Sequence, residues 1–234
     1  MKIGVLFSGG KDSTLALHYA LKYSDVKCLV SLVSKNPASY MFHTPNIRLV
    51  GKQAEAIGIP IIIERTKGEK EIELKDLERA IKKAIKIYRI EGIVTGALES
   101  IYQASRIQRI CSKLGIECFN PLWQRNQLEL LGEIIKLRFD VIITGVFAEG
   151  IENLAGKRID REFLEEIGKA HEKYKINPAG EGGEFESLVL DAPFFRKRLD
   201  ILKSRIKEDR QGGKVLEITE TRLLKKEKNE KNEK

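Results

Sequence analysis

Residues 8–14 read Ser-Gly-Gly-Lys-Asp-Ser-Thr, and this short stretch decides the fold of the chain. The apolar run at residues 3–7 predicts a buried strand before it, and apolar residues at helical spacing over 15–21 predict a helix after it. A glycine-rich turn between a strand and a helix favours an anion, because free backbone N–H groups and the helix dipole both attract negative charge. Glycines admit close approach of a ligand, and hydroxyl side chains add donors. The predicted anion-binding residues are Ser8, Gly9, Gly10, Ser13 and Thr14.

Two common nucleotide motifs do not fit this loop. A Walker A loop would have glycine in place of Val5 and serine or threonine in place of Asp12, and a dinucleotide fingerprint has another glycine spacing. The pattern Ser-Gly-Gly-x-Asp-Ser instead resembles the pyrophosphate-binding PP-loop of the ATP pyrophosphatases. That resemblance implies cleavage of ATP between its α and β phosphates and adenylation of an acid or a carbonyl oxygen. The alternative, a glycine-rich turn without a ligand, would not need two hydroxyls around an aspartate.

Composition limits the class of protein. The chain has 234 residues, 42% of them hydrophobic, which suffices for one large domain or two modest ones. The net charge of +8 permits attraction to nucleic acid or an acidic protein, although interleaved Lys and Glu indicate solvated helix faces. Of the three cysteines, Cys28 and Cys111 lie in apolar patterns and are expected in the core. Without a signal peptide or a bilayer-spanning apolar run, we expect a soluble, cytoplasmic protein.

Strands and helices alternate up to residue 145. Alternation of this kind predicts an α/β fold, a parallel sheet with helices on both faces, whose ligands bind at the carboxyl ends of the strands. The 8–14 loop, the 34–45 loop, Gly96 and Gly145 are therefore expected at one edge, with Asn46 capping the helix that follows it. Further strands are predicted at 26–33, 59–64, 92–96 and 140–145, and further helices at 47–57, 71–90, 100–114 and 127–138.

The pattern changes beyond residue 150. A helix at 160–174, a turn-rich stretch at 177–183, a strand at 184–190 and a closing hairpin at 196–224 predict a smaller C-terminal α+β domain. We expect an ATP-binding domain over residues 1–130, a substrate-binding domain over 131–224, and a disordered charged tail over 225–234.

Two groups of side chains suggest binding chemistry beyond the loop. Tyr102, Arg106 and Arg109 share one face of the helix at 100–114, where they could hold a phosphate or a carboxylate, or simply form a solvated face. In the 180–187 turn, three glycines alternate with three glutamates that could hold ammonium, Mg²⁺ or a cationic substrate, or be solvated in a hairpin turn. No His, Cys or carboxylate cluster has zinc spacing, and His18 and His171 are interpreted as structural.

Four short sequence motifs narrow the resemblance to one family. They are His-Thr-Pro-Asn at 43–46, Gly-Ala-Leu-x-Ser-x-Tyr-Gln-x-x-Arg at 96–106, Pro-Leu-Trp at 121–123 and Gly-Glu-Gly-Gly-Glu-Phe-Glu-Ser at 180–187. Together with the PP-loop, and over residues 2–195, they resemble the diphthine–ammonia ligase family. The resemblance implies a HUP-like sheet and a ligase that amidates diphthine on translation elongation factor 2 through an acyl-adenylate. It also implies ammonium as a substrate and ATP and Mg²⁺ as cofactors. The absence of a long apolar run and of a basic stripe with aromatic residues argues against membrane and nucleic-acid partners, and a homo-oligomer stays open.

The resemblance also implies residue roles. For ATP and pyrophosphate they fall on Ser8, Gly9, Gly10, Asp12, Ser13, Thr14 and Gly96. Catalytic roles fall on Asp12, which would also position Mg²⁺, and on Lys11 and Arg106. Substrate contacts fall on His43, Tyr102, Gln103, Trp123, Glu181, Gly182, Gly183, Glu184 and Glu186. Trp123 in core packing is an equal alternative.

Two other functions stay open at the level of sequence. A PP-loop enzyme that adenylates a transfer-RNA base would suit the basic composition, but the chain lacks both paired cysteines and a Lys/Arg stripe interleaved with aromatic residues. A non-catalytic regulator on the same fold would bind ATP without forming AMP.

Overall fold

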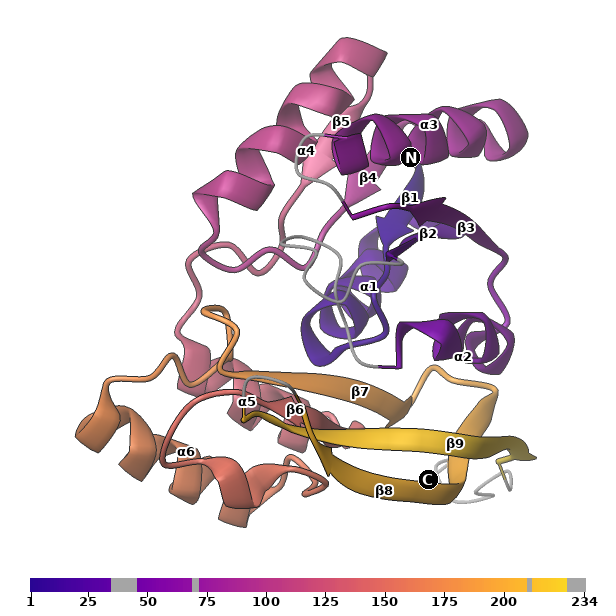
Figure 1. Cartoon of the computed structure of the whole chain (residues 1–234). Coiled ribbons are helices and arrows are strands. Elements are labelled where there is room, and N and C mark those ends of the chain that lie inside the picture. The colour runs from indigo at the N-terminus through magenta and orange to yellow at the C-terminus, as the bar shows by residue number, and fades with distance from the viewer. Residues whose placement is uncertain (35–45, 69–71, 210–211, 227–234) are drawn as a thin grey trace, which may run out of the picture.

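Two sheets make up the computed structural model, which describes residues 1–34, 46–68, 72–209 and 212–226 (Figure 1). The first sheet is entirely parallel and has the strand order β3-β2-β1-β4-β5. Its strands are β1 (Lys2–Leu6), β2 (Asp25–Ser34), β3 (Ile61–Thr66), β4 (Gly92–Val94) and β5 (Glu117–Phe119). The predicted α/β class is therefore confirmed for the N-terminal unit.

Helices cover both faces of this sheet. The first two, α1 (Lys11–Tyr23) and α2 (Val50–Ile57, preceded by the 3₁₀ turn η1, Ile47–Leu49), lie on the side that faces the second sheet (Figure 1). The other face is covered by α3 (Ile72–Tyr88) and α4 (Ile101–Leu114), whose apolar side chains form a separate core cluster. Helices on opposite faces follow from right-handed crossovers on either side of the central strand β1.

The second sheet is antiparallel, with the order β7-β6-β9-β8. It contains β6 (Asp140–Val146), β7 (Phe185–Asp191), β8 (Lys197–Glu208) and β9 (Lys214–Lys225). The helices α5 (Gln127–Lys136) and α6 (Arg161–Tyr174) pack with it, and the 3₁₀ turn η2 (Glu152–Leu154) follows β6. This arrangement confirms the predicted smaller α+β unit with its closing hairpin.

The prediction that β6 extends the parallel sheet is wrong. β6 pairs antiparallel with both β7 and β9, so Gly145 does not share an edge with the 8–14 loop. Residues 141–146 are buried throughout, and a strand covered on both faces has the same apolar pattern in either kind of sheet. Periodicity alone therefore could not assign this strand to its sheet.

Some local predictions are confirmed and others need correction. Cys28 and Cys111 are fully buried, and burial raises the pKa of the Cys28 thiol to about 12. Ile101, whose apolar side chain would be expected to face the core, is the first residue of α4 and is 73% exposed. Asn46 does not cap the following turn through its side chain, which instead donates to the Leu216 carbonyl oxygen at 3.0 Å.

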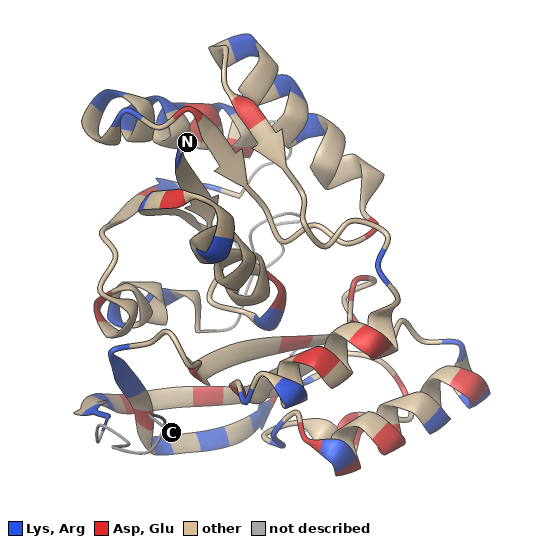
Figure 2. Ribbon diagram, turned by 180° about the vertical axis from the view of Figure 1, so that it is seen from behind, with Lys and Arg blue, Asp and Glu red and all other residues tan. Residues whose placement is uncertain are grey.

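The charge pattern follows the sequence expectation. Basic and acidic positions are interspersed along the helices (Figure 2). Among the described helices, none has both the length and the apolar composition needed to cross a bilayer. Residues 35–45, with His43, and residues 227–234 lie outside the described residues, so the predictions made for them are not addressed. Lys225, expected at the start of the disordered tail, is instead the last residue of β9.

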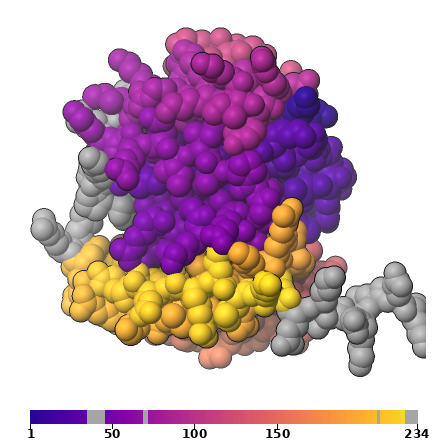
Figure 3. Space-filling view, turned by 90° about the vertical axis from the view of Figure 1, so that its right-hand side faces the viewer, coloured from indigo at the N-terminus to yellow at the C-terminus, as the bar shows by residue number. Residues whose placement is uncertain are grey.

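The two units are packed directly together (Figure 3). The largest core cluster joins Leu15 and Leu17 of α1 to Val189 of β7 and Phe163 of α6. At its centre lies Gln53 of α2, which is fully buried and donates its amide to the Gly9 carbonyl oxygen at 2.9 Å and to the Val189 carbonyl oxygen at 2.7 Å. One side chain thus connects the anion loop, α2 and the second sheet.

Replacing Gln53 with alanine should destabilise the whole chain. Gln53→Ala leaves the buried Val189 carbonyl without this donor and opens a cavity, so we expect the free energy of unfolding to fall by about 2–4 kcal/mol. Gln108→Ala is the matched control, because Gln108 is exposed on α4, and should change it by less than about 0.5 kcal/mol. Guanidinium denaturation measures both, and equal effects would contradict the central role of Gln53.

Candidate active site

The 8–14 loop has the geometry of an anion-binding turn. Gly10 is extended, with φ −79° and ψ 173°, and is followed directly by the first turn of α1. Gly9 has φ +81°, and a Cβ atom there would lie 2.0 Å from the Gln53 side-chain oxygen, so only glycine fits. The hydroxyls of Ser13 and Thr14 donate to the Gly10 carbonyl oxygen at 3.2 and 2.8 Å and hold the turn closed.

A cavity of about 210 Å³ opens beside this loop. It lies at the carboxyl ends of β1, β2 and β4, where ligands bind in open α/β sheets. Gly96 lines it and is fixed by close packing, since a Cβ atom there would lie 2.7 Å from both the Asp12 carbonyl carbon and the Ser13 backbone nitrogen. The polar residues and glycine of the lining are Ser8, Asp12, Ser13, Ser31, Thr95, Gly96, Gln103 and Glu181.

Ser31 and Thr95 are lining residues that the sequence did not reveal. Ser31 is 2% exposed on β2, and its hydroxyl has no hydrogen-bond partner among the described residues. A buried unpaired hydroxyl in a cavity is a position where a polar ligand atom would be accommodated. The available signal was a serine in the middle of an otherwise apolar strand. The sheet order is needed to place this strand beside β1 and the 8–14 loop.

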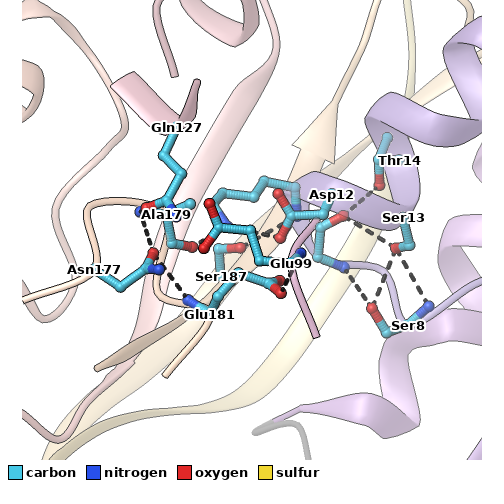
Figure 4. Close-up of polar contacts among 12 residues, drawn as sticks. Ser8, Asp12, Ser13, Thr14, Glu99, Gln127, Asn177, Ala179, Glu181 and Ser187 are labelled. Carbon is cyan, nitrogen blue, oxygen red and sulfur yellow. Dashed lines mark hydrogen bonds and ion pairs between the residues drawn. The ribbon is translucent and has the colours of Figure 1, made fainter. Parts of the chain in front are cut away.

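Glu181 reaches the same cavity from the C-terminal unit (Figure 4). One carboxylate oxygen accepts a long hydrogen bond from the Glu99 backbone N–H at 3.4 Å. The side-chain oxygen of Asn177 accepts from the backbone N–H groups of Ala179 and Glu181 at 3.0 and 3.3 Å, which shapes the turn. Burial raises the pKa of the Glu181 carboxyl, and the nearby Asp12 carboxylate adds to this rise. Two acidic groups therefore face the cavity from opposite units.

The other residues of the 180–187 turn are placed differently. The Glu184 carboxylate accepts from the Asn177 backbone N–H at 2.8 Å, so it shapes its own loop. Gly182 and Gly183 are exposed at the tip, and Glu186 is half-buried on β7. Of the three predicted glutamates, only Glu181 is among the described residues that line the cavity. The substrate contacts predicted for the others stay predictions.

The Lys11 side chain contacts both units. Its ammonium donates to the Ala179 carbonyl oxygen at 2.5 Å and pairs with an Asp12 carboxylate oxygen at 2.6 Å. The side chain is 4% exposed and lies 5.4 Å from the centre of the Phe185 ring. The ammonium thus contacts the 177–183 loop of the other unit, and the catalytic role predicted for Lys11 is not tested by this geometry.

Of the three residues of α4 to which the resemblance assigns roles, one lines the cavity and two do not. Gln103 lines the cavity, and its backbone N–H is capped by Ser100 at 3.3 Å. The Arg106 guanidinium lies 3.4 Å from the centre of the Tyr102 ring, and neither residue belongs to the described lining. Trp123 is half-buried in the turn after β5, also outside the lining. Their predicted roles in catalysis and substrate binding are not tested by this geometry.

The described residues contain no group of three or more His, Cys, Asp or Glu side chains arranged to hold a metal ion. Asp12 nevertheless fits Mg²⁺ as a ligand, since this ion is often bound by one or two carboxylates together with substrate phosphates. Its carboxylate lines the cavity, is one-quarter exposed, and lies at the helix N-terminus that favours phosphate.

Comparison with protein-family models decides the family. Residues 1–118 match the diphthamide synthase N-terminal domain, and residues 126–224 match the diphthamide synthase C-terminal domain. The chain belongs to the diphthamide synthase family. The resemblance based on the four sequence motifs and the PP-loop is thereby confirmed.

Curated relatives of this family member are named diphthine–ammonia ligase. The bovine protein is 31% identical and the human protein 30% identical, each over 88% of this chain and 85% of the relative. The fission yeast protein is 29% identical over 91% of this chain, which spans only 38% of that longer relative. A solved structure titled as a predicted subunit of tRNA methyltransferase from Methanocaldococcus jannaschii is 17% identical to this chain, with a TM-score of 0.44. The match covers 82% of this chain and 98% of that chain, and the likeness is too weak for any conclusion.

Substituting Gly96 should damage the ATP site from outside the loop. In Gly96→Ala the new methyl group meets the backbone of Asp12 and Ser13, so the loop has to shift, and we expect affinity for a non-hydrolysable ATP analogue to fall at least about tenfold (about 1.4 kcal/mol). Gly132→Ala is the control, because a Cβ atom there meets nothing within 4 Å. Calorimetric titration measures both, and unchanged affinity in Gly96→Ala would contradict the site.

Proposed function

We propose that this chain catalyses the ATP-dependent amidation of diphthine to diphthamide, with release of AMP and pyrophosphate. The observation that carries the proposal is the shared cavity, which the PP-loop lines from one unit and Glu181 from the other. Membership in a family with curated relatives named diphthine–ammonia ligase supports the same reaction. The substrates are ATP, ammonium and diphthine-bearing translation elongation factor 2, and the reaction takes place in the cytoplasm.

The diphthine carboxylate has to be activated first, because ammonia does not attack a free carboxylate. Attack of this carboxylate on the α phosphate of ATP forms an acyl-adenylate and expels pyrophosphate. Ammonium loses a proton to solvent, and the resulting ammonia forms the C–N bond at the carbonyl carbon. AMP leaves with the electrons of the broken C–O bond, and a second proton is lost to solvent as the amide forms. The N–H groups of the 8–14 loop and the α1 dipole stabilise the negative charge that accumulates on the departing pyrophosphate. Mg²⁺ bound at Asp12 would neutralise part of the phosphate charge.

The acceptor is bound from the other side of the cavity. Diphthine carries a trimethylammonium group, and the Glu181 carboxylate offers a partly desolvated negative charge for it. We assign ATP binding to residues 1–130 and acceptor binding to residues 131–224. Both assignments are parts of the proposal, as is assembly into a homo-oligomer.

The reaction is tested directly by supplying diphthine-bearing elongation factor 2, ATP, Mg²⁺ and ammonium. AMP, pyrophosphate and the mass of the modified histidine are followed together. Absence of both AMP and amide would overturn the proposal. Binding of ATP without AMP formation would point to the regulator. The transfer-RNA enzyme is not favoured by the family match, and a salt-sensitive gel shift of transfer RNA would be needed to revive it.

Loss of the Asp12 carboxylate should stop the first half of the reaction. For Asp12→Ala we expect pyrophosphate release from ATP to fall at least about 100-fold, the usual scale for removal of one charge-stabilising group. Asp25→Ala is the control, because Asp25 is exposed at the opposite end of β2. If Asp12→Ala releases pyrophosphate at the wild-type rate, Asp12 has no catalytic role.

Loss of the Glu181 charge should weaken acceptor binding. For Glu181→Gln we expect the KM for elongation factor 2 to rise roughly tenfold, equivalent to about 1.4 kcal/mol, and the KM for ATP to stay within about twofold. Glu172→Gln, on the exposed side of α6, is the control. Equal KM values for the acceptor in Glu181→Gln and wild type would remove Glu181 from the acceptor site.

A further inference from the structure

Lys11 belongs to the ATP-binding motif, yet most of its contacts are with the acceptor side of the cavity. Its backbone N–H donates to the Ser187 hydroxyl at 3.2 Å, and its ammonium donates to the Ala179 carbonyl oxygen at 2.5 Å. Ser187 lies on β7 and Ala179 in the 177–183 loop, so two points of the C-terminal unit are fixed by one residue of the PP-loop. Among the described residues, Lys11 is the only buried lysine.

The contact with Ala179 sits where the loop needs an external support. Ala179 is two residues from Glu181, and the glycines on either side of Glu181 provide little resistance to movement of the turn. Gly180 has φ +76° and Gly183 has φ +86°, conformations that glycine adopts and leaves easily. The internal hydrogen bonds of Asn177 shape the turn, and besides Lys11 the loop is linked to the N-terminal unit by the long hydrogen bond from the Glu99 backbone N–H to Glu181 at 3.4 Å.

The electrostatics agree with a fixed position. An ammonium in the interior is stable only when it is paired and fully hydrogen-bonded, and Lys11 obtains a carboxylate from one unit and a carbonyl oxygen from the other. Removing the ammonium would leave the Ala179 carbonyl without this donor and Asp12 without its cation. The 177–183 loop would then lose its hydrogen bond to the first residue of α1.

We infer that Lys11 is a positioning residue for acceptor binding, holding the 177–183 loop so that Glu181 faces the cavity, and that it is not a phosphate ligand. The inference rests on the proposed function for its acceptor. Lys11 would thereby couple the motif that binds ATP to the loop that binds the protein substrate.

The test combines Lys11→Met with Glu181→Gln. For Lys11→Met we expect the Kd of a non-hydrolysable ATP analogue to stay within about twofold, and the KM for elongation factor 2 to rise roughly tenfold. Because Lys11 acts through Glu181, the double variant should be no worse than Glu181→Gln alone. Lys86→Met, which removes an exposed lysine of α3, is the matched control.

Three results would overturn the inference. They are loss of ATP affinity in Lys11→Met, a wild-type KM for the acceptor, and multiplication of the two effects to roughly 100-fold in the double variant. If Lys11→Met does not fold, Lys11→Arg keeps the buried charge and should give an acceptor KM between the wild-type value and that of Glu181→Gln, again with unchanged ATP affinity. A weakened ATP affinity in Lys11→Arg would equally contradict the inference.

A second readout does not depend on the reaction. Backbone hydrogen exchange in the peptide that contains residues 177–183 should be faster in Lys11→Met than in wild type, while exchange in the α6 helix stays unchanged. Unchanged exchange in the loop would contradict the inference even if the enzyme is active. Conversely, if wild type forms neither AMP nor amide, the proposed function fails while the exchange result still decides the role of Lys11 in holding the loop.

Discussion

The structure depends on the way the Gly9 carbonyl oxygen is held. It accepts the Val189 backbone N–H at 2.9 Å and the buried Gln53 amide at the same distance. The Gly10 carbonyl oxygen is satisfied within the loop by the Ser13 and Thr14 hydroxyls, whereas the Gly9 carbonyl oxygen has to be satisfied from outside the loop. Here the second sheet and α2 do this, so the C-terminal unit completes the phosphate loop before any substrate is bound.

This constraint explains why the two units share one core. A free-standing PP-loop domain would expose α1, α2 and the back of the loop, whereas the largest cluster runs from Ile3 through Leu15 to Val189. Side chains from the η1–α2 segment also reach β9, where Lys52 donates to the Thr221 carbonyl oxygen at 2.9 Å. The cavity is lined by the N-terminal unit and by Glu181 of the C-terminal unit, so the packing of the two units pre-organises it and reduces the entropy lost when a substrate binds.

The sequence predicted those features that depend on local pattern. The β1–loop–α1 turn, the helix stops at Gly58 and Gly115 and the β8–β9 hairpin follow from glycine placement and periodicity. The sheet that receives β6 and the direction in which Lys11 points depend on partners that are distant in the sequence. Gln53 is intermediate, because a glutamine at the inward spacing of Val50 and Ile57 is a visible anomaly whose purpose appears only with Gly9 and Val189 in place.

The charge distribution around the cavity gives the arrangement its chemical logic. The described lining contains two acidic side chains, Asp12 and Glu181, and no Lys or Arg, although one of the substrates is ATP. In the proposed function, neutral donors, namely backbone N–H groups and the α1 dipole, would hold the phosphates. A lysine directed into the cavity would attract phosphate but would also repel a cationic acceptor and ammonium. Lys11, turned beneath the 177–183 loop, avoids that conflict while its charge still stabilises Asp12.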